Sequence, residues 1–176
     1  MWDLHLENGY DIRVLGQDHR EAVARLSESC RDYFLLHFGR PPIPSDIDGI
    51  YEDLPPGKGY EDKFLLGVFA EEGRLAGLVE LIRDYKEAGS WALGMMLLGP
   101  AERGRGLGRA IHSTLAKKTR TLGADRLRIV VAHDNLKGQA FWKAMGYEKT
   151  EHKCMMIGGK NHEVDIMRLP LTVESE

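Results

Sequence analysis

The stretch from Leu97 to Leu122 constrains the fold most, because an apolar run passes through a glycine-rich turn into an amphipathic helix. In the helical part, from Gly106 to Leu122, apolar residues recur along one face, and Gly123 follows as a stop signal. A strand that leads through a tight turn into a helix is the building unit of α/β proteins. The sequence therefore predicts an α/β (α+β) domain built around this connection.

The rest of the chain supplies further strands and helices. Apolar periodicity predicts, in order, a strand over 10–15, a helix over 18–38, a hairpin of strands over 64–70 and 75–83, strands over 91–98 and 127–131, a helix over 136–145, and two strands over 147–157 and 163–169. Asp18 is the expected N-cap of the first helix, with Glu21 as its return partner. We expect one domain over 1–176, with a mixed, mostly antiparallel central sheet flanked by helices.

Residues 40–62 differ in composition from the rest. Five of the seven prolines fall there, which excludes a long helix or a central strand and predicts a long loop. Loops of this length in compact domains are usually functional or disordered, so we expect a loop that shapes a substrate site. From Arg40 to Lys63 it has three basic residues and six acidic ones: Asp46, Asp48, Glu52, Asp53, Glu61 and Asp62.

Composition excludes several classes of protein. A net charge of −3 and a pI of about 6.2 give no general basic field, so nucleic acid is not expected as a partner. No run reaches the roughly 20 apolar residues of a membrane span, and the N-terminal residues lack the layout of a signal peptide. Cys30 and Cys154 lie far apart and are expected to be buried thiols in a reducing compartment, which favours the cytoplasm.

The glycine-rich turn has the features of a phosphate site. Gly104, Gly106 and Gly108 let an anion approach the backbone, and the following helix directs free N–H groups and its positive dipole end to the same point. No acidic residue lies between Arg103 and Ala124, whereas six basic ones do: Arg103, Arg105, Arg109, Lys117, Lys118 and Arg120. This local excess predicts an anionic ligand; the alternative is a simple tight connection.

Two known phosphate-binding patterns do not fit. The dinucleotide pattern G-x-G-x-x-G lacks its last glycine, because Arg109 and Ile111 stand where it is needed. The P-loop pattern fails because Gly99 is not followed at the right spacing by Gly-Lys-Ser/Thr.

The segment Arg103-Gly104-Arg105-Gly106-Leu107-Gly108 resembles the signature of the GNAT acetyltransferase superfamily, [Q/R]-x-x-G-x-[G/A], at all three defined positions. A second marker of that family follows in the right order, with Asn135, then Trp142, then Gly146-Tyr147. The resemblance covers about residues 60–157. It implies the GNAT fold and a binding core for acetyl-coenzyme A (acetyl-CoA) over about 90–147.

The resemblance also implies roles for particular residues. The coenzyme pyrophosphate would lie on the amides of the turn, and the pantetheine arm would run along the backbone of Met96 and Leu98. Asn135 would contact the pantetheine, although a helix N-cap is an equal alternative for it. The residues implied in acetyl-CoA binding are Met96, Leu98, Arg103, Gly104, Arg105, Gly106, Leu107, Gly108, Arg109, Asn135 and Trp142. No metal site is expected, because the seven histidines show no ligand spacing.

The catalytic groups depart from the family pattern. Trp142 stands where the family has a tyrosine acid, so we expect it to line or pack the site, and the acid stays open. Ala92 stands where relatives often carry a glutamate base. Glu80 is the preferred base because it interrupts an apolar strand, where an unpaired carboxylate is costly. An ion pair with Arg83 or Arg74 is the alternative, and the weaker candidates for the base are Asp84, Glu87 and His133.

The function expected from these residues is transfer of an acetyl group from acetyl-CoA to a primary amine of a small molecule. The acidic residues of 40–63 suggest a cationic acceptor, although they would equally solubilise a loop. One alternative is a non-catalytic module that binds acyl-CoA, suggested by the missing tyrosine. Another is a nucleic-acid-binding basic helix, which the acidic remainder argues against. A homodimer is left open.

Overall fold

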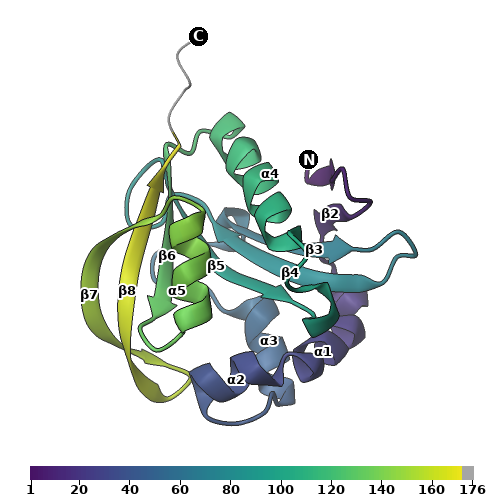
Figure 1. Ribbon diagram of the computed structural model, residues 1–176, viewed down its shortest axis with the longest axis horizontal. Helices are drawn as coiled ribbons and strands as arrows, with labels where there is room; N and C mark the ends of the chain where they lie inside the picture. The colour runs from purple at the N-terminus through teal and green to yellow at the C-terminus, as the bar shows by residue number, and fades with distance from the viewer. Residues whose placement is uncertain (172–176) are drawn as a thin grey trace.

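The computed structural model describes residues 1–171. Its centre is one eight-stranded sheet with the strand order β1-β2-β3-β4-β5-β6-β8-β7 (Figure 1). The strands are β1 (Asp3–His5), β2 (Asp11–Val14), β3 (Lys63–Phe69), β4 (Leu75–Ile82), β5 (Ser90–Leu98), β6 (Arg126–Ala132), β7 (Glu148–Ile157) and β8 (Lys160–Pro170). Every neighbouring pair is antiparallel except β5 with β6. The prediction of a mixed, mostly antiparallel sheet flanked by helices is confirmed.

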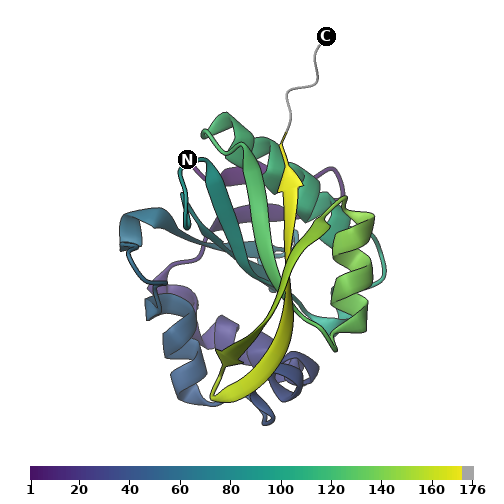
Figure 2. The ribbon, with the colours of Figure 1, turned by 90° about the vertical axis from the view of Figure 1, so that its left-hand side faces the viewer.

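Helices cover the two faces of the sheet, as Figures 1 and 2 show. They are α1 (Arg20–Ser29), α2 (Arg31–Phe38), α3 (Pro44–Glu52), α4 (Leu107–Thr121) and α5 (Leu136–Ala144). One apolar cluster joins α4 to the sheet through Leu107, Ile111 and Leu115. A second joins α1, α2 and α3 to the opposite face. The sheet is therefore the middle layer of three.

The sheet splits between β5 and β6. These two strands pair only where Ser90–Ala92 meet Arg126–Arg128, and they separate beyond that point. The register between β4 and β5 also shifts there: Glu80 faces Met95 and Leu81 faces Leu93, so Gly94 has no partner in β4. Such a bulge bends its strand, and it leaves the rest of β5 with a free edge toward the split.

The N-terminal half differs from the sequence prediction in three places. A short strand, β1, precedes the expected first strand. The expected helix over 18–38 is two helices separated at Cys30, and Asp18 lies in a 3₁₀ turn instead of capping them. The loop predicted over 40–62 contains α3, because Pro44 occupies the first helical position, where its fixed φ suits a helix. The Asp46 carboxylate accepts the Ile43 N–H, 2.8 Å away, and completes that helix start.

The two cysteines have different environments. Cys30 is buried, as predicted, and its Sγ lies 3.3 Å from the Leu98 carbonyl oxygen. Cys154 is exposed, so the prediction that it is buried was wrong. It lies in β7, the edge strand, whose outer residues alternate toward solvent.

Candidate active site

The glycine-rich turn has the backbone geometry that an anion site requires. Gly104 and Gly106 have φ angles of 75° and 81°, in the left-handed region that only glycine adopts readily. Gly106 is the N-cap of α4, and the first turn of that helix contains no acidic residue. The free N–H groups of this turn and the positive end of the helix therefore face the same open space.

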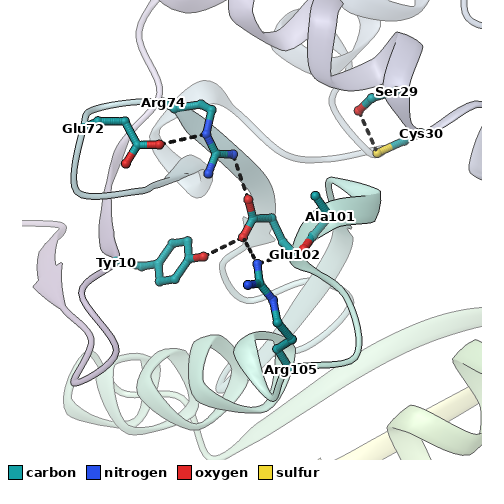
Figure 3. Close-up of polar contacts among 8 residues, drawn as sticks. All are labelled: Tyr10, Ser29, Cys30, Glu72, Arg74, Ala101, Glu102 and Arg105. Carbon is teal, nitrogen blue, oxygen red and sulfur yellow. Dashed lines mark hydrogen bonds and ion pairs between the residues drawn. The ribbon is translucent and has the colours of Figure 1, made fainter.

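The buried Glu102 carboxylate holds this turn in place (Figure 3). The residue is 2% exposed and accepts hydrogen bonds from the Tyr10 hydroxyl (2.5 Å), Arg74 (2.7 Å) and Arg105 (3.1 Å). The Tyr10 bond is the largest cause that lowers the pKa of Glu102; burial opposes it and Arg74 adds to it. Arg105 stays exposed, but its guanidinium is held by the Glu102 carboxylate and the Ala101 carbonyl, which the sequence did not indicate.

The other two arginines of the turn differ in their contacts. Arg103 forms an ion pair with Asp32 in α2, at 2.5 Å, and its Nε donates to the Leu98 carbonyl at 2.9 Å. Arg109 lies exposed in the first turn of α4. The backbone amides and Arg109 thus remain as the groups available to a phosphate.

Gly108 is a packing glycine. A Cβ at this position would lie 3.3 Å from the ring of Phe141 in α5 and 3.6 Å from the side chain of Leu98. Glycine is needed at 108 so that α4 and α5 can approach closely. At 104 and 106 it is needed for a different reason, the positive φ angles of an exposed turn.

The free edge of β5 carries the two backbone positions that the sequence indicated. The Gly99 N–H donates to Ala76 in β4 at 2.9 Å. Because hydrogen-bonding direction alternates along an antiparallel strand, the polar groups of Leu98 and Met96 then face away from β4, toward the split. This edge therefore presents unpaired backbone groups to the split, although the Leu98 carbonyl already accepts a hydrogen bond from Arg103.

Asn135 and Trp142 belong to α5, which follows β6 and so lies across the split from the edge of β5. The Asn135 side chain accepts the Gly138 N–H at 3.0 Å, so it is the N-cap of α5. Trp142 is partly buried among rings, with centroids 4.8 Å from Phe141, 5.3 Å from Tyr147 and 5.9 Å from His112. Its place in this aromatic cluster fits a packing role.

The same cluster contains a buried polar pair that the sequence did not reveal. His112 Nε2 lies 3.1 Å from the Tyr147 hydroxyl. Burial lowers the pKa of His112 to about 4 and raises that of Tyr147. The imidazole is therefore neutral at pH 7, and the pair is an uncharged hydrogen bond beneath α4.

Glu80 lies at the bulge, on the face of the sheet opposite α4. Its Oε2 forms an ion pair with Lys63 at 3.0 Å, and the Lys63 ammonium also donates to the Asp53 carbonyl at 2.7 Å. The expected alternative partners were wrong, because Arg83 pairs with Asp62 and Arg74 with Glu102. Oε1 lies against Gly94, where a Cβ would come within 2.4 Å of it.

Glu80 lines a cavity of about 330 Å³ at the split. Strands β4, β5 and β6, the segment after α3, the β4–β5 loop and β7 all contribute to the wall. The lining residues are Asp53, Leu54, Pro55, Glu80, Ile82, Tyr85, Lys86, Ala92, Leu93, Gly94, Arg128, Ile129, Val130 and Met155. This size is in the range of small-molecule sites.

The weaker candidates for the base do not line this cavity. The Asp84 carboxylate accepts the Gly89 N–H at 2.7 Å, and Glu87 forms an ion pair with Arg126 at 2.8 Å. His133 Nδ1 lies 3.1 Å from Asp165. Each of them has a local structural partner.

The acidic residues of 40–63 are mostly paired within the chain. Asp46 pairs with Arg40, and Asp62 pairs with Arg83 and Lys58. Arg20 pairs with both Asp48 and Glu52. Of the six acidic residues of this segment, Asp53 lines the cavity. The segment therefore contributes fewer negative charges to the site than its composition suggested.

One His/Asp cluster forms away from the cavity. His133, His152 and Asp165 place ligand atoms within 4.8 Å of one another, although they are far apart in sequence. Lys149 and Gln139 also donate to the Asp165 carboxylate, each at 3.0 Å. Burial acts to raise the pKa of Asp165, but the bonds from His152, Lys149 and His133 outweigh it and lower the pKa. These contacts satisfy the carboxylate; the absence of a metal stays a prediction.

Comparison with known proteins identifies the class. The model of the acetyltransferase (GNAT) family matches residues 25–147, and the chain belongs to this family of acyl-transferring enzymes. It is 26% identical over 144 residues to a mycothiol acetyltransferase of Beutenbergia cavernae, a match that covers 81% of this chain. The chain spans about half the length of that relative, 46%. No helix of residues 1–171 is long and apolar enough to cross a membrane.

Solved structures share the fold. An acetyltransferase from Thermus thermophilus superposes with a TM-score of 0.73 at 21% identity, covering 95% of this chain and 99% of that one. A spermidine N-acetyltransferase from Vibrio cholerae, solved with coenzyme A and spermine, gives 0.73 at 18% identity, covering 94% and 97%. Enzymes of this fold use acetyl-CoA.

Proposed function

We propose that this protein transfers the acetyl group of acetyl-CoA to a primary amine of a small molecule. The observation that carries the proposal is the split between β5 and β6. The glycine turn and the free edge of β5 approach the split from the side of α4, and the cavity lined by Glu80 approaches it from the other face. A thioester and an amine that entered from opposite faces would meet beside Gly94.

The residues divide the binding of acetyl-CoA between backbone and side chains. The amides of 103–108, with Arg109, hold the pyrophosphate, and the backbone of Met96 and Leu98 holds the pantetheine arm. Leu107 anchors the start of α4 in the core. Asn135 and Trp142, in α5, border the coenzyme on the face of the sheet that carries α4. Bound in this way, the coenzyme supplies an activated acetyl group.

The chemistry then needs a free amine and an acceptor for its proton. An alkylammonium ion with a pKa near 10.4 is almost wholly protonated at pH 7, so a base must take one proton. Glu80, directly or through a water, takes it. The amine nitrogen forms the new N–C bond as the C–S bond breaks, and the coenzyme leaves as a thiolate. The second proton of the nitrogen passes to that thiolate or to water as the neutral amide forms. With a thiol pKa of about 8.5, this leaving group does not depend on an acid at Trp142.

The acceptor is proposed to carry a positive charge at its reacting end. Glu80 and Asp53 place two carboxylates among the lining residues, beside the cations Lys86 and Arg128, and a carboxylate attracts the ammonium end of an acceptor. The spermidine acetyltransferase of the same fold makes polyamines one class to test. A homodimer and a cytoplasmic location complete the proposal; light scattering and cell fractionation test them.

The test is a screen of primary amines with acetyl-CoA and a thiol-detecting reagent. Acetylated product, identified by mass spectrometry together with one equivalent of released thiol, supports the proposal. The second candidate is a non-catalytic acyl-CoA-binding module, favoured by the absence of the usual tyrosine at 142. It predicts that acetyl-CoA raises the melting temperature while no amine increases thiol release above the rate of hydrolysis.

A further inference from the structure

Arg128, in β6, is a buried charge that the proposed transfer reaction does not use. It lines the cavity and is only 4% exposed. Within residues 1–171 its guanidinium makes no hydrogen bond or ion pair, and Nε is a buried donor without a partner. An arginine stays protonated at any ordinary pH, and a buried unpaired charge is strongly unfavourable. A ligand that brings an anion would remove this cost.

The arginines next to Arg128 have ion-pair partners, whereas Arg128 has none in the described part of the chain. Arg168 lies beside it in the register of β6 and β8, and pairs with Glu151 at 2.8 Å. Arg126, two residues earlier, pairs with Glu87, also at 2.8 Å. The chain therefore neutralises both neighbouring arginines and leaves the one that points into the cavity. Burial lowers the pKa of Arg128, as expected for a cation held without a partner.

The β4–β5 loop positions an aromatic ring over this arginine. The Cζ of Arg128 lies 5.4 Å from the centroid of the Tyr85 ring, a cation–π contact that leaves the donor edges of the guanidinium available. Asp84 and Lys86, on either side of Tyr85, have φ angles of 49° and 71°, which are unfavourable for residues other than glycine. Strained backbone of this kind clusters at ligand sites.

The location decides which anion fits. Leu127 and Ile129 face the core beneath α4, so Arg128, between them in β6, faces the opposite side of the sheet from the glycine turn. The coenzyme phosphates therefore do not reach it. Glu80 is paired with Lys63, and Asp53 and Lys86 bring opposite charges to the lining, so Arg128 leaves one positive charge for a ligand to balance. A single carboxylate matches one guanidinium in charge and in its two-pronged geometry.

We propose that the acceptor is an amino acid or a similar amino-carboxylate, whose carboxylate binds Arg128 while its amine lies near Glu80. Ile82, Ala92 and Arg128 lie in one row across β4, β5 and β6, and Glu80 lies two residues from Ile82 along β4. Two strand spacings of about 4.8 Å and a rise of about 3.4 Å per residue therefore separate the main chains of Glu80 and Arg128 by roughly 12 Å before their side chains extend inward. One small molecule can therefore bridge them. This inference rests on the proposed amine acetylation and names its substrate class; polyamines, which lack a carboxylate, would leave Arg128 unpaired.

The test compares acceptors that differ only in the carboxylate. Glycine, β-alanine, γ-aminobutyrate and δ-aminovalerate are each assayed beside their carboxamides. For the best chain length we expect kcat/KM to be about 10- to 100-fold higher for the acid than for the amide, the range of a hydrogen bond to a charged group. Arg128→Met should abolish this preference and leave the KM for acetyl-CoA unchanged. Arg168→Met, in the same row of the sheet but paired with Glu151, should retain it.

A binding measurement separates failure of this inference from failure of the proposed function. In the presence of coenzyme A, the amino acids should raise the melting temperature of the wild type and of Arg168→Met, but not of Arg128→Met. Without any acceptor, Arg128→Met should be as stable as the wild type or more stable, because it removes an unpaired buried charge. Acceptance of other amines with no preference for acids, in turnover and in melting temperature alike, would overturn the carboxylate site and leave the acetyltransferase standing. If no amine is acetylated, the melting-temperature comparison still decides the role of Arg128.

Discussion

At the β5–β6 split, the two faces of the sheet present different groups to a ligand: backbone on the face of α4 and side chains on the face of the cavity. On the side of α4, the binding surface is backbone, and most of its charged side chains are already paired: Arg103 with Asp32 and Arg105 with Glu102. On the other face, six segments build the cavity, and Arg128 has no hydrogen-bond or ion-pair partner among residues 1–171. A surface made of backbone is little changed by mutation and suits a ligand that is the same in every reaction, such as the coenzyme. A surface made of side chains can change its specificity through single substitutions. The coenzyme side is therefore expected to be the generic half and the cavity the selective half.

The largest effect should follow a change in the backbone half. Gly106→Val places a β-branched residue at a φ of 81°, so the turn must change shape to relieve the strain. We expect acetyl-CoA affinity to fall at least about 100-fold, as judged by the loss of its stabilising shift in melting temperature. Gly123→Val is the control, because it has a φ of 99° and open space at the other end of α4. An equal loss in both variants would show that general strain, and not the anion site, is responsible.

In the side-chain half, Glu80→Gln should reduce turnover without affecting the coenzyme. Loss of a general base typically costs about 10²-fold or more, so we expect that loss in kcat at pH 7 with an unchanged KM for acetyl-CoA. The deficit should shrink near pH 9.5, where much more of the amine is already deprotonated. An equal deficit at both pH values would assign Glu80 a structural role, as the partner of Lys63.

Glu102→Gln tests whether the backbone half depends on a buried carboxylate beneath it. Removing one partner of a buried ion pair costs about 3 kcal/mol, so chemical unfolding at pH 7 should show a loss of that order. Because the folded pKa of Glu102 is lowered, its contribution is present above the unfolded pKa and is lost as pH falls through the folded value. The difference between wild type and variant should therefore shrink toward pH 3. Glu72→Gln, which removes an exposed partner of the same Arg74, should change stability little.

Asp53→Asn should have a smaller effect, confined to the cavity. We expect a KM for cationic amines raised a few-fold, with the difference reduced at high salt because the attraction is electrostatic. Asp48→Asn is the matched control from the same segment, since Asp48 pairs with Arg20. A rise of similar size in both variants would mean that the whole segment acts through its net charge.

The smallest effect is expected for Trp142→Phe. Its ring packs against Phe141, Tyr147 and His112, and a phenyl ring preserves most of that contact. Turnover should stay within about tenfold of the wild type, below the loss typical of a general acid. A larger loss with normal acetyl-CoA binding would make the indole a participant in the transfer itself.

The same division explains what the sequence could predict. The turn and α4 lie within 20 residues of each other, so spacing and composition indicated both. The cavity depends on register: the bulge at Gly94 brings Glu80 to the split, and the pairing of β5 with β6 brings Arg128 there. A single sequence reveals neither the register shift between β4 and β5 nor the pairing of β5 with β6. Arg128 carried one weak signal, a charge in the middle of an alternating apolar strand. The helix α3 was missed because prolines were interpreted as breakers, although Pro44 begins it.

The strand order β6-β8-β7 has a consequence for how the protein is made. Strand β8 lies between β6 and β7, which both precede it in the sequence, so β6 has an unpaired edge until Lys160–Pro170 has left the ribosome. That edge stays exposed for the time needed to translate about 40 further residues, a few seconds at typical rates of synthesis. An open edge of this kind invites pairing with other chains. Slower translation over β7 should therefore lengthen this exposure and lower the yield of folded protein, and a chaperone bound to the open edge should restore it.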